Sequence, residues 1–216
     1  MDITYLGHSS FRIASKLATI VTDPFDPKMV GLKFSSTTAD IITISHDHED
    51  HNFTSAITNV KKILSGPGEY EIGGVSFIGL PTFHDGEKGA KRGKNTIFII
   101  EADGLRLAHL GDLGHDLSEK DVNAIGEIDV LMIPVGGEFT LGPQEAAIVA
   151  RNIEPKIILP MHFKVEGLND QVFAGLEKVD AFISELGLKV ENLPKLNLKE
   201  GGILSDDQTI ALLEKK

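Results

Sequence analysis

Cysteine is absent from the 216-residue chain. Its absence excludes disulfides, a thiolate nucleophile and any cysteine-ligated zinc or iron–sulfur site. Metal ligands in this chain must therefore come from histidine, aspartate and glutamate, and the sequence holds 8 histidines and 32 acidic residues from which to draw them.

Long apolar runs are also missing, and basic residues are outnumbered. No stretch approaches the roughly 18–20 consecutive apolar residues that a membrane-spanning helix needs. The 21 lysines and arginines give the chain a formal net charge of −11, which would repel a polyanion. We therefore expect neither a membrane nor a long nucleic acid as partner, although a local basic patch stays open.

The N-terminal residues Met1–Leu6 do not form the basic segment and apolar core of a signal peptide. We therefore expect a cytoplasmic protein. The 41% hydrophobic and 25% charged content is ordinary for a globular protein, and a chain of this length can form a single domain over residues 1–216. Whether it forms a homo-oligomer stays open.

The first half of the chain predicts strands separated by turns. The run Ala102-Asp-Gly104 predicts a hairpin turn, and Phe53, Ile57 and Val60 predict a helix over residues 52–60. Residues 23–39 predict a long irregular segment that borders a site. The strands are expected at residues 3–6, 11–14, 17–22, 41–44, 62–64, 75–81, 96–101 and 105–109.

The second half predicts a β-α-β unit and a longer helix. Apolar strands at residues 128–134 and 156–160 flank a helix over 142–152, which Pro143 could open. Residues 169–186 predict one amphipathic helix that ends at Gly187. This arrangement favours an α+β fold whose sheets are covered by helices on their outer faces.

Residues 46–51 read His-Asp-His-Glu-Asp-His directly after the apolar run at 40–45. If extended backbone continues through His46 and His48, both imidazoles share one face and can share one ion. A turn into the next segment would aim Asp50 and His51 at a second ion, about 3.5–4 Å from the first. The remaining members, Asp47 and Glu49, would face solvent or support the ligands.

Three further candidates follow predicted strands: His84, Asp112 and His162. The resulting order, His-x-His-x-Asp-His followed by His, Asp and His, resembles the metallo-β-lactamase superfamily over nearly the whole chain. Shorter segments strengthen the resemblance: Thr22-Asp23-Pro24 to its acidic first motif, Gly111-Asp112 to its bridging aspartate and Pro160-Met-His162 to its last histidine. Residues 136–143 and 155–162 resemble the small single-domain hydrolases related to the ascorbate-6-phosphate lactonase group.

The resemblance implies a four-layer αβ/βα sandwich, with two sheets face to face and a dinuclear site at one edge. Asp112 would bridge the two metals, and Asp23 would orient the ligand segment through hydrogen bonds. The resemblance assigns His46, His48 and His84 to the first metal and Asp50, His51 and His162 to the second.

Imidazole and carboxylate ligands without a thiolate suit Zn²⁺, with Mn²⁺, Fe²⁺ and Co²⁺ as alternatives. Superfamily members with a di-iron redox centre commonly have Glu where this chain has His48, so we expect two zinc ions and hydrolysis. Metal binding would lower the pKa of a water towards about 7 and supply a hydroxide. Asp50, Asp112 and His115 are the candidate catalytic residues, the carboxylates for passing protons and His115 for substrate contact or proton transfer.

The substrate is expected to be a small anionic ester, lactone or phosphodiester. Two other functions stay open: a small-nucleotide phosphodiesterase of the same fold, and a metal-binding scaffold or ligand sensor without catalysis. Basic residues near the ligands could bind a substrate phosphate or carboxylate, or could be solvated; they are Lys88, Lys91, Arg92, Lys94 and Lys164. Glu138 and Thr140 are candidates to line the pocket.

Two histidines have weaker claims. His8 could support the site from behind the ligands or have a purely structural role, because one histidine alone says little. His109, three residues before Asp112 within a predicted strand, is expected to be a packed or ligand-supporting histidine.

Overall fold

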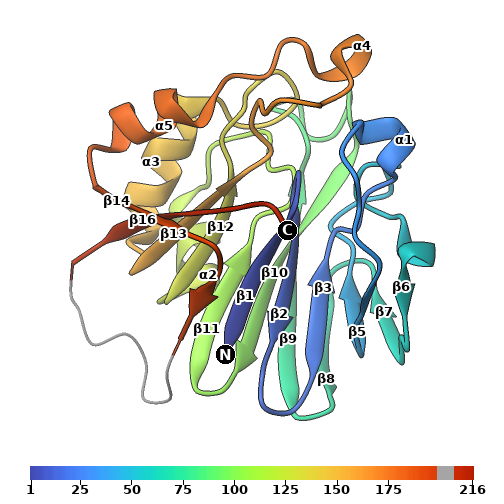
Figure 1. The fold of residues 1–216 in the computed structure, drawn as a ribbon. Coiled ribbons are helices and arrows are strands. Elements are labelled where there is room, and N and C mark those ends of the chain that lie inside the picture. The colour runs from blue at the N-terminus through green and yellow to red at the C-terminus, as the bar shows by residue number, and fades with distance from the viewer. Residues whose placement is uncertain (199–206) are drawn as a thin grey trace.

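Two sheets packed face to face form the centre of the computed structural model, which describes residues 1–198 and 207–216 (Figure 1). The six-stranded sheet has the order β15-β1-β2-β3-β5-β7. Strands β1, β2 and β3 are antiparallel, while β5 and β7 run parallel to β3. Its strands are β1 (Asp2–Gly7), β2 (Ser10–Ala14), β3 (Thr19–Thr22), β5 (Ile41–Thr43), β7 (Lys62–Leu64) and β15 (Leu196–Asn197).

The eight-stranded sheet has the order β14-β16-β13-β12-β11-β10-β9-β8. It is antiparallel from β8 to β11 and parallel from β11 to β14. Its strands are β8 (Gly68–Ile72), β9 (Val75–Phe83), β10 (Lys94–Ala102), β11 (Leu105–His109), β12 (Val130–Pro134), β13 (Ile157–Met161), β14 (Lys189–Leu193) and β16 (Thr209–Leu213).

The main core lies between the two sheets. Phe11 of the six-stranded sheet and Phe77 and Phe98 of the eight-stranded sheet belong to one buried cluster. Successive side chains of a strand point to opposite faces, so the neighbours of Phe98, Ile97 and Ile99, belong instead to a second cluster on the outer face of their sheet. The eight-stranded sheet is therefore buried on both faces.

Helices and irregular segments cover the outer faces (Figure 1). α2 (Glu119–Ile125), α3 (Pro143–Ile153) and α5 (Val179–Leu186) pack on the eight-stranded sheet. A third apolar cluster covers the six-stranded sheet. It draws on α1 (Pro27–Val30), η1 (Thr54–Ala56), α4 (Asp170–Phe173) and β6 (Ile57–Thr58). β6 pairs with β4 (Thr37–Thr38) in a small two-stranded sheet. The expected α+β class and layered sandwich are confirmed.

Two local predictions are also confirmed. In the hairpin, Ala102 pairs with Leu105, and Asp103 and Gly104 between them have φ angles of 55° and 74°; positive φ at both central residues is typical of the type I′ turn. The β-α-β unit consists of β12, α3 and β13, whose strands are parallel. Both elements depend on local sequence signals.

The helix predicted over residues 52–60 is wrong. This segment forms only η1 and then β6, in which Ile57 and Thr58 pair with Thr37 and Thr38. The helical spacing of its apolar residues is offset by Asn, Thr and Ser, which favour turns and caps over helix interiors. Pairing with a segment about twenty residues earlier therefore decides the structure.

The single helix predicted over residues 169–186 is also wrong, because the segment contains two helices, α4 and α5. The residues between them bond to other segments: Glu177 donates its N–H to Gly136 O and accepts the N–H of Lys164. Strand β8 and helix α2 were not predicted. Ser118 and Asp121 form a capping box at the start of α2, a signal that the sequence did contain.

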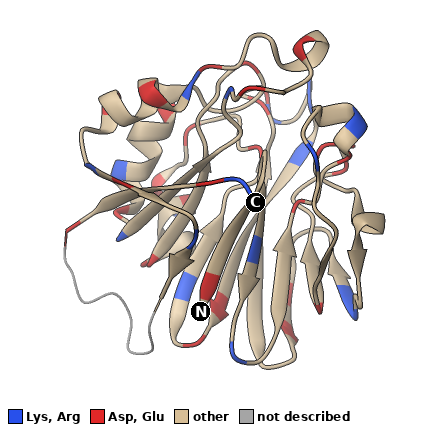
Figure 2. Ribbon diagram, viewed as in Figure 1, with Lys and Arg blue, Asp and Glu red and all other residues tan. Residues whose placement is uncertain are grey.

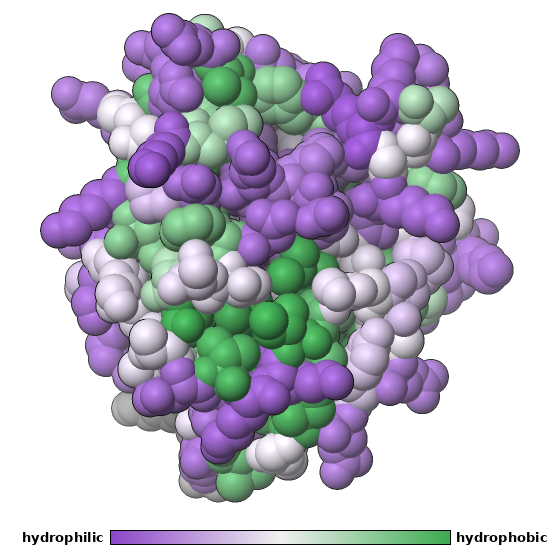
Figure 3. Space-filling model, turned by 90° about the vertical axis from the view of Figure 1, so that its right-hand side faces the viewer, coloured by the Kyte–Doolittle hydropathy of each residue, from purple (hydrophilic) through white to green (hydrophobic). Residues whose placement is uncertain are grey.

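The surface carries both signs of charge. Charged residues gather on the outer helices, turns and strand ends (Figure 2), while apolar side chains gather on the side where β7 and β8 form the sheet edges (Figure 3). Ile63 of β7 is 43% exposed. Within residues 1–198 and 207–216, no helix combines the length and apolar character needed to cross a membrane.

Phe98→Ala tests the packing between the sheets. Phe98 is fully buried in the core cluster, and removing such a ring costs about 3–5 kcal/mol of unfolding free energy. Ile148→Ala on α3 is the control, because Ile148 is 46% exposed and its truncation should cost less than about 1 kcal/mol. Denaturant unfolding measures both, and equal losses would contradict this account of the core.

Candidate metal centre

The histidine-rich segment and the three later candidates lie at one edge of the sandwich. Residues 46–51 follow β5, His84 follows β9, Asp112 follows β11 and His162 follows β13. Strands β9, β11 and β13 run in the same direction within their sheet, so their carboxyl ends meet at one edge. The topology thus brings together residues that are far apart in the sequence.

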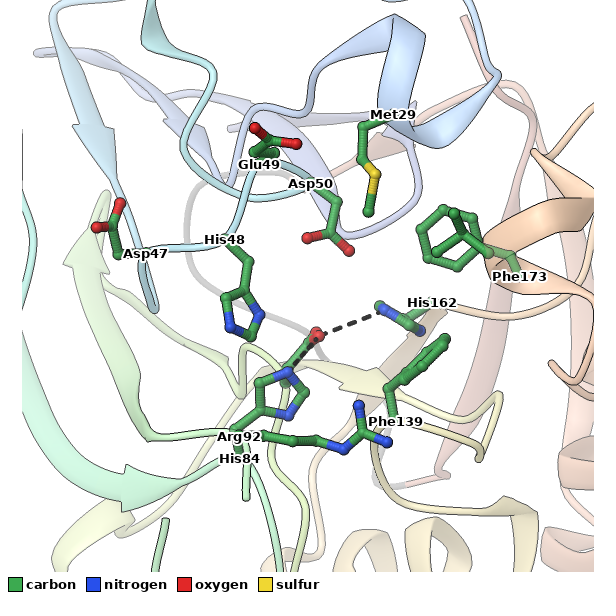
Figure 4. A pocket seen from close by; sticks show the side chains of 12 residues that line it. Met29, Asp47, His48, Glu49, Asp50, His84, Arg92, Phe139, His162 and Phe173 are labelled. Atoms are coloured by element: carbon green, nitrogen blue, oxygen red, sulfur yellow. Dashed lines mark ion pairs between the residues drawn. The ribbon is translucent and has the colours of Figure 1, made fainter. Parts of the chain in front are cut away.

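Asp112 is the hub of this cluster. Its side chain is buried, and Oδ2 lies 3.2 Å from His51 Nε2 and 3.4 Å from the Nε2 atoms of both His84 and His162. His46 Nε2 is 3.9 Å away. One carboxylate oxygen is thus within 4 Å of four imidazole nitrogens. Figure 4 marks the pairs that it makes with His84 and His162.

Among the described residues, three groups of potential ligands have their ligand atoms within 4.8 Å of one another, and one of them combines Asp23 with His46 and His51. The remaining two groups hold the other candidates. The first group is His46, His48 and His84; the second is Asp50, His51 and His162, with His8 as a fourth member. These groups coincide with the two ligand sets that the resemblance implied, apart from the added His8.

The local geometry of residues 46–51 differs from the extended segment that the alternation predicted. β5 ends at Thr43, and a tight turn follows in which His51 N–H and Asn52 N–H both donate to His48 O. His46 Nε2 nevertheless lies 3.0 Å from His48 Nδ1. The turn, and not a helix, aims Asp50 and His51 at the second group, while Asp47 is exposed as expected.

Asp23 fixes the segment of residues 45–51 through hydrogen bonds. Its buried carboxylate accepts the N–H of Ser45 at 2.8 Å, the hydroxyl of Ser45 at 2.5 Å and Nδ1 of His51 at 2.9 Å. Ser45 Oγ in turn lies 2.9 Å from His46 Nδ1. With their Nδ1 atoms engaged, His46 and His51 present Nε2 to the cluster, which is the orientation that metal-binding histidines need.

The electrostatics of the cluster favour a cation. Burial lowers the pKa of His46 to about 3 and that of His8 to about 4, so both rings are neutral, the form that binds metal. Burial alone would raise the pKa of Asp112, but His162 and His51 hold it well below its ordinary value. Burial alone would lower the pKa of His51, but Asp112 and Asp50 raise it well above its ordinary value.

Several buried polar atoms in the cluster have no hydrogen-bond partner. They include His51 Nε2, His162 Nε2 and Asp112 Oδ1. Buried polar atoms are rarely left unsatisfied, and all three lie in the cluster where carboxylates and imidazoles converge. A divalent cation would satisfy these atoms, so the donor set fits a metal.

The three remaining histidines, His8, His109 and His115, have different surroundings from one another. His8 Nε2 lies 3.1 Å from Asp50 Oδ2 and its ring is buried, so it supports the second group; no spacing signal could have assigned it there. His109 is packed as expected, with Nε2 2.8 Å from Ser9 O. His115 is not among the cavity-lining residues: its Nε2 accepts the N–H of Phe83, and its Nδ1 lies 2.8 Å from Asp116 O.

A cavity of about 370 Å³ opens beside the cluster. Met29, Arg92, Phe139 and Phe173 surround the candidate ligands at its walls (Figure 4). The prediction from the sequence did not include Phe139. It named the neighbouring Glu138 and Thr140 instead, and neither of these lines this cavity.

Comparison with known families gives this site a context. A family model described as "Beta-lactamase superfamily domain" matches residues 2–162, a range that contains every candidate ligand. The chain belongs to this superfamily. The resemblance drawn from the ligand order in the sequence is confirmed.

Relatives of this β-lactamase superfamily member have names that agree with a metal site. A UPF0173 metal-dependent hydrolase of Methanoculleus marisnigri is 33% identical over 188 residues, which cover 76% of this chain and 81% of the relative. One from Methanopyrus kandleri is 28% identical over 88% of this chain and 95% of the relative. A solved structure from Thermotoga maritima, described as a proposed Zn-dependent hydrolase of the metallo-β-lactamase superfamily, is 37% identical, with a TM-score of 0.78 and 98% coverage of both chains.

Asp23→Asn tests the support of the ligand segment. An amide keeps the size of the carboxylate but replaces one acceptor oxygen by an NH2 donor, so Ser45 and His51 can lose the oxygen that they share. We expect zinc affinity, measured by competition with a chelator, to fall about 10–100-fold. Asp180→Asn, at an exposed carboxylate on α5, is the control. Unchanged affinity in Asp23→Asn would contradict the assigned role.

The raised pKa of His51 predicts proton release. In the metal-free protein at pH 7 the ring is an imidazolium with a proton on each nitrogen, and a metal that binds Nε2 must displace the proton there. The calorimetric heat of zinc binding should therefore depend on the ionisation enthalpy of the buffer. The contribution of His51 should disappear as the pH rises through its raised pKa, because the ring is then already neutral. Equal heats in all buffers at pH 7 would count against this site.

Proposed function

We propose that the chain is a dinuclear zinc hydrolase acting on a small molecule. The observation that carries the proposal is the position of Asp112, whose Oδ2 lies within 4 Å of His46, His51, His84 and His162. A carboxylate between two ligand groups favours two ions over one. The relatives named metal-dependent hydrolases support the reaction class.

Each group has a chemistry that suits zinc. His46, His48 and His84 would hold the first ion, and Asp50, His51 and His162 the second, with Asp112 shared between them. When bound, such a pair of metal ions supplies a hydroxide at neutral pH and polarises the bond to be cleaved. The resemblance favours zinc over iron, because superfamily members with a di-iron redox centre commonly have Glu where this chain has His48.

The chain's own residues would orient the reaction and move protons. Asp50 lines the cavity, and its Oδ2 lies 3.1 Å from His8 Nε2, so this carboxylate is the one placed to pass a proton to a leaving group in the cavity. Asp112 lies deeper, at 1% exposure, which suits a bridging ligand better than a proton carrier. His115, placed off the cavity, is the weakest of the three catalytic candidates.

The cavity supports a small-molecule substrate. Its volume of about 370 Å³ is in the range of ordinary small-ligand sites. A long nucleic acid would meet a chain of net charge −11. An ester, a lactone or a phosphodiester of a small molecule is therefore the proposed substrate class.

Metal counting coupled to a substrate panel tests the proposal. Wild-type protein should hold two zinc ions per chain by elemental analysis and hydrolyse a small ester, lactone or phosphodiester. His48→Ala should lose about one ion, and Asp112→Asn should weaken both sites, each with at least about a hundredfold loss of kcat/KM, because metal and nucleophile are lost together.

Asp180→Asn, which alters an exposed carboxylate on α5, is the matched control and should keep both the metal and the activity. A wild-type protein that holds two zinc ions but turns over nothing, while a ligand raises its melting temperature, would instead support the ligand-sensor alternative. A protein that binds no divalent metal would contradict the proposal outright.

A further inference from the structure

Of the described residues, Arg92 brings the only guanidinium to the cavity of about 370 Å³, and no ammonium group lines it. A neighbouring cavity, which His46 and His48 also line, holds Lys94 beside Arg92. We propose that Arg92 binds an anionic oxygen group of the substrate, and that the rest of the substrate is apolar. The inference rests on the proposed hydrolase function and specifies its substrate class. A carboxylate and a phosphate group share the chemistry required.

Most N–H donors of the Arg92 guanidinium are not used in hydrogen bonds within the described residues. Nη2 donates to Glu138 O at 3.3 Å, and the guanidinium carbon lies 4.7 Å from the centre of the Phe139 ring. No carboxylate in the described parts of the chain pairs with it. By contrast, Lys91 pairs with Glu87 and Lys164 with Asp170. The remaining N–H groups of Arg92 match the planar geometry of a carboxylate or phosphate.

The loop that carries Arg92 is fixed to the candidate metal ligands. Asp85, the residue after His84, accepts four backbone N–H groups at 2.7–2.9 Å, and they belong to Glu87, Gly89, Lys91 and Arg92. One buried carboxylate therefore sets the position of Arg92 relative to His84. A cation held in place before binding loses little entropy when an anion arrives.

One wall of the cavity is apolar and the other is polar, and this difference indicates the chemistry of the rest of the substrate. Met29, Phe139 and Phe173 lie on one side, and His48 and Asp47 on the other (Figure 4). Glu49 adds a second exposed carboxylate to the lining. The apolar side suits an aliphatic or aromatic group, and the carboxylates repel a second anionic group. The geometry points to a substrate with one anionic end and one apolar end.

Matched inhibitors separate anion binding by Arg92 from anion binding by the metals. We would use hydroxamates, because the hydroxamate occupies the metals and leaves the other groups to the protein. The parent compound carries a benzyl group and a terminal carboxylate. Three analogues replace the carboxylate by a phosphonate, the carboxylate by a carboxamide, and the benzyl group by a methyl group. Calorimetry on the zinc-loaded full chain gives each Kd.

Wild-type protein should bind the carboxylate or the phosphonate at least about tenfold more tightly than the carboxamide, as expected for charge-assisted hydrogen bonds. The tighter of the two identifies the anionic group. Arg92→Gln should abolish this preference without changing the zinc content, and Arg92→Lys should restore part of it. Lys88→Gln removes a charge from an exposed position on the same loop and should keep the preference. The benzyl compound should bind more tightly than the methyl compound.

Three results would overturn the inference. A preference for the anion that persists in Arg92→Gln would assign the anion to the metals. Zinc-loaded wild-type protein that binds every probe equally, or binds none, would leave Arg92 without a role while the metal site stands. A wild-type protein without zinc would overturn the proposed function, and this inference with it.

Discussion

The structure depends on the burial of three carboxylates at one edge of a β-sandwich. Asp23, Asp50 and Asp112 are all buried, and their pKa values are all lowered, because burial, which alone would raise them, is outweighed by the surrounding imidazoles. Such a concentration of negative charge away from water is unfavourable unless a cation compensates it. Much of the local architecture follows from this constraint: the turn at residues 48–52, the hydrogen bonds of Asp23 and the meeting of the strand ends.

The β-sandwich holds the residues that carry these side chains in fixed positions. Asp112 lies three residues after β11 and His162 lies directly after β13, and both strands are buried on both faces. The backbone N–H of Asp112 donates to Asn95 Oδ1 and that of His162 donates to His8 O, so both backbones are held where their side chains enter the cluster. Loops would carry the recognition: Arg92 and Phe139 lie on loops and line the cavity, and Asp85 fixes the loop of Arg92. The rigid elements would thus hold the metals, while the loops distinguish among substrates.

Elements with strong local signals could be predicted from the sequence. The β-α-β unit, the Asp103-Gly104 turn and the cluster at residues 46–51 are encoded over short distances. The superfamily assignment followed from the order of that cluster and the later His84, Asp112 and His162. The segment at 52–60 could not be predicted, because β6 forms by pairing with β4, a partner without its own signal. The break between α4 and α5 likewise depends on Gly136 and Lys164, which are distant in sequence. For His8 the sequence left a supporting role and a purely structural role open, and the contact with Asp50 favours the first. Phe139 was found through the fold alone, since it belongs to no motif.

The central claim is that two cations lie on either side of Asp112. The most direct measurement is the anomalous scattering of a crystal of the zinc-loaded protein at the zinc absorption edge. The account predicts two peaks per chain, one bounded by His46, His48 and His84 and the other by Asp50, His51 and His162, with Asp112 between them. A single peak, or peaks away from Asp112, would contradict it.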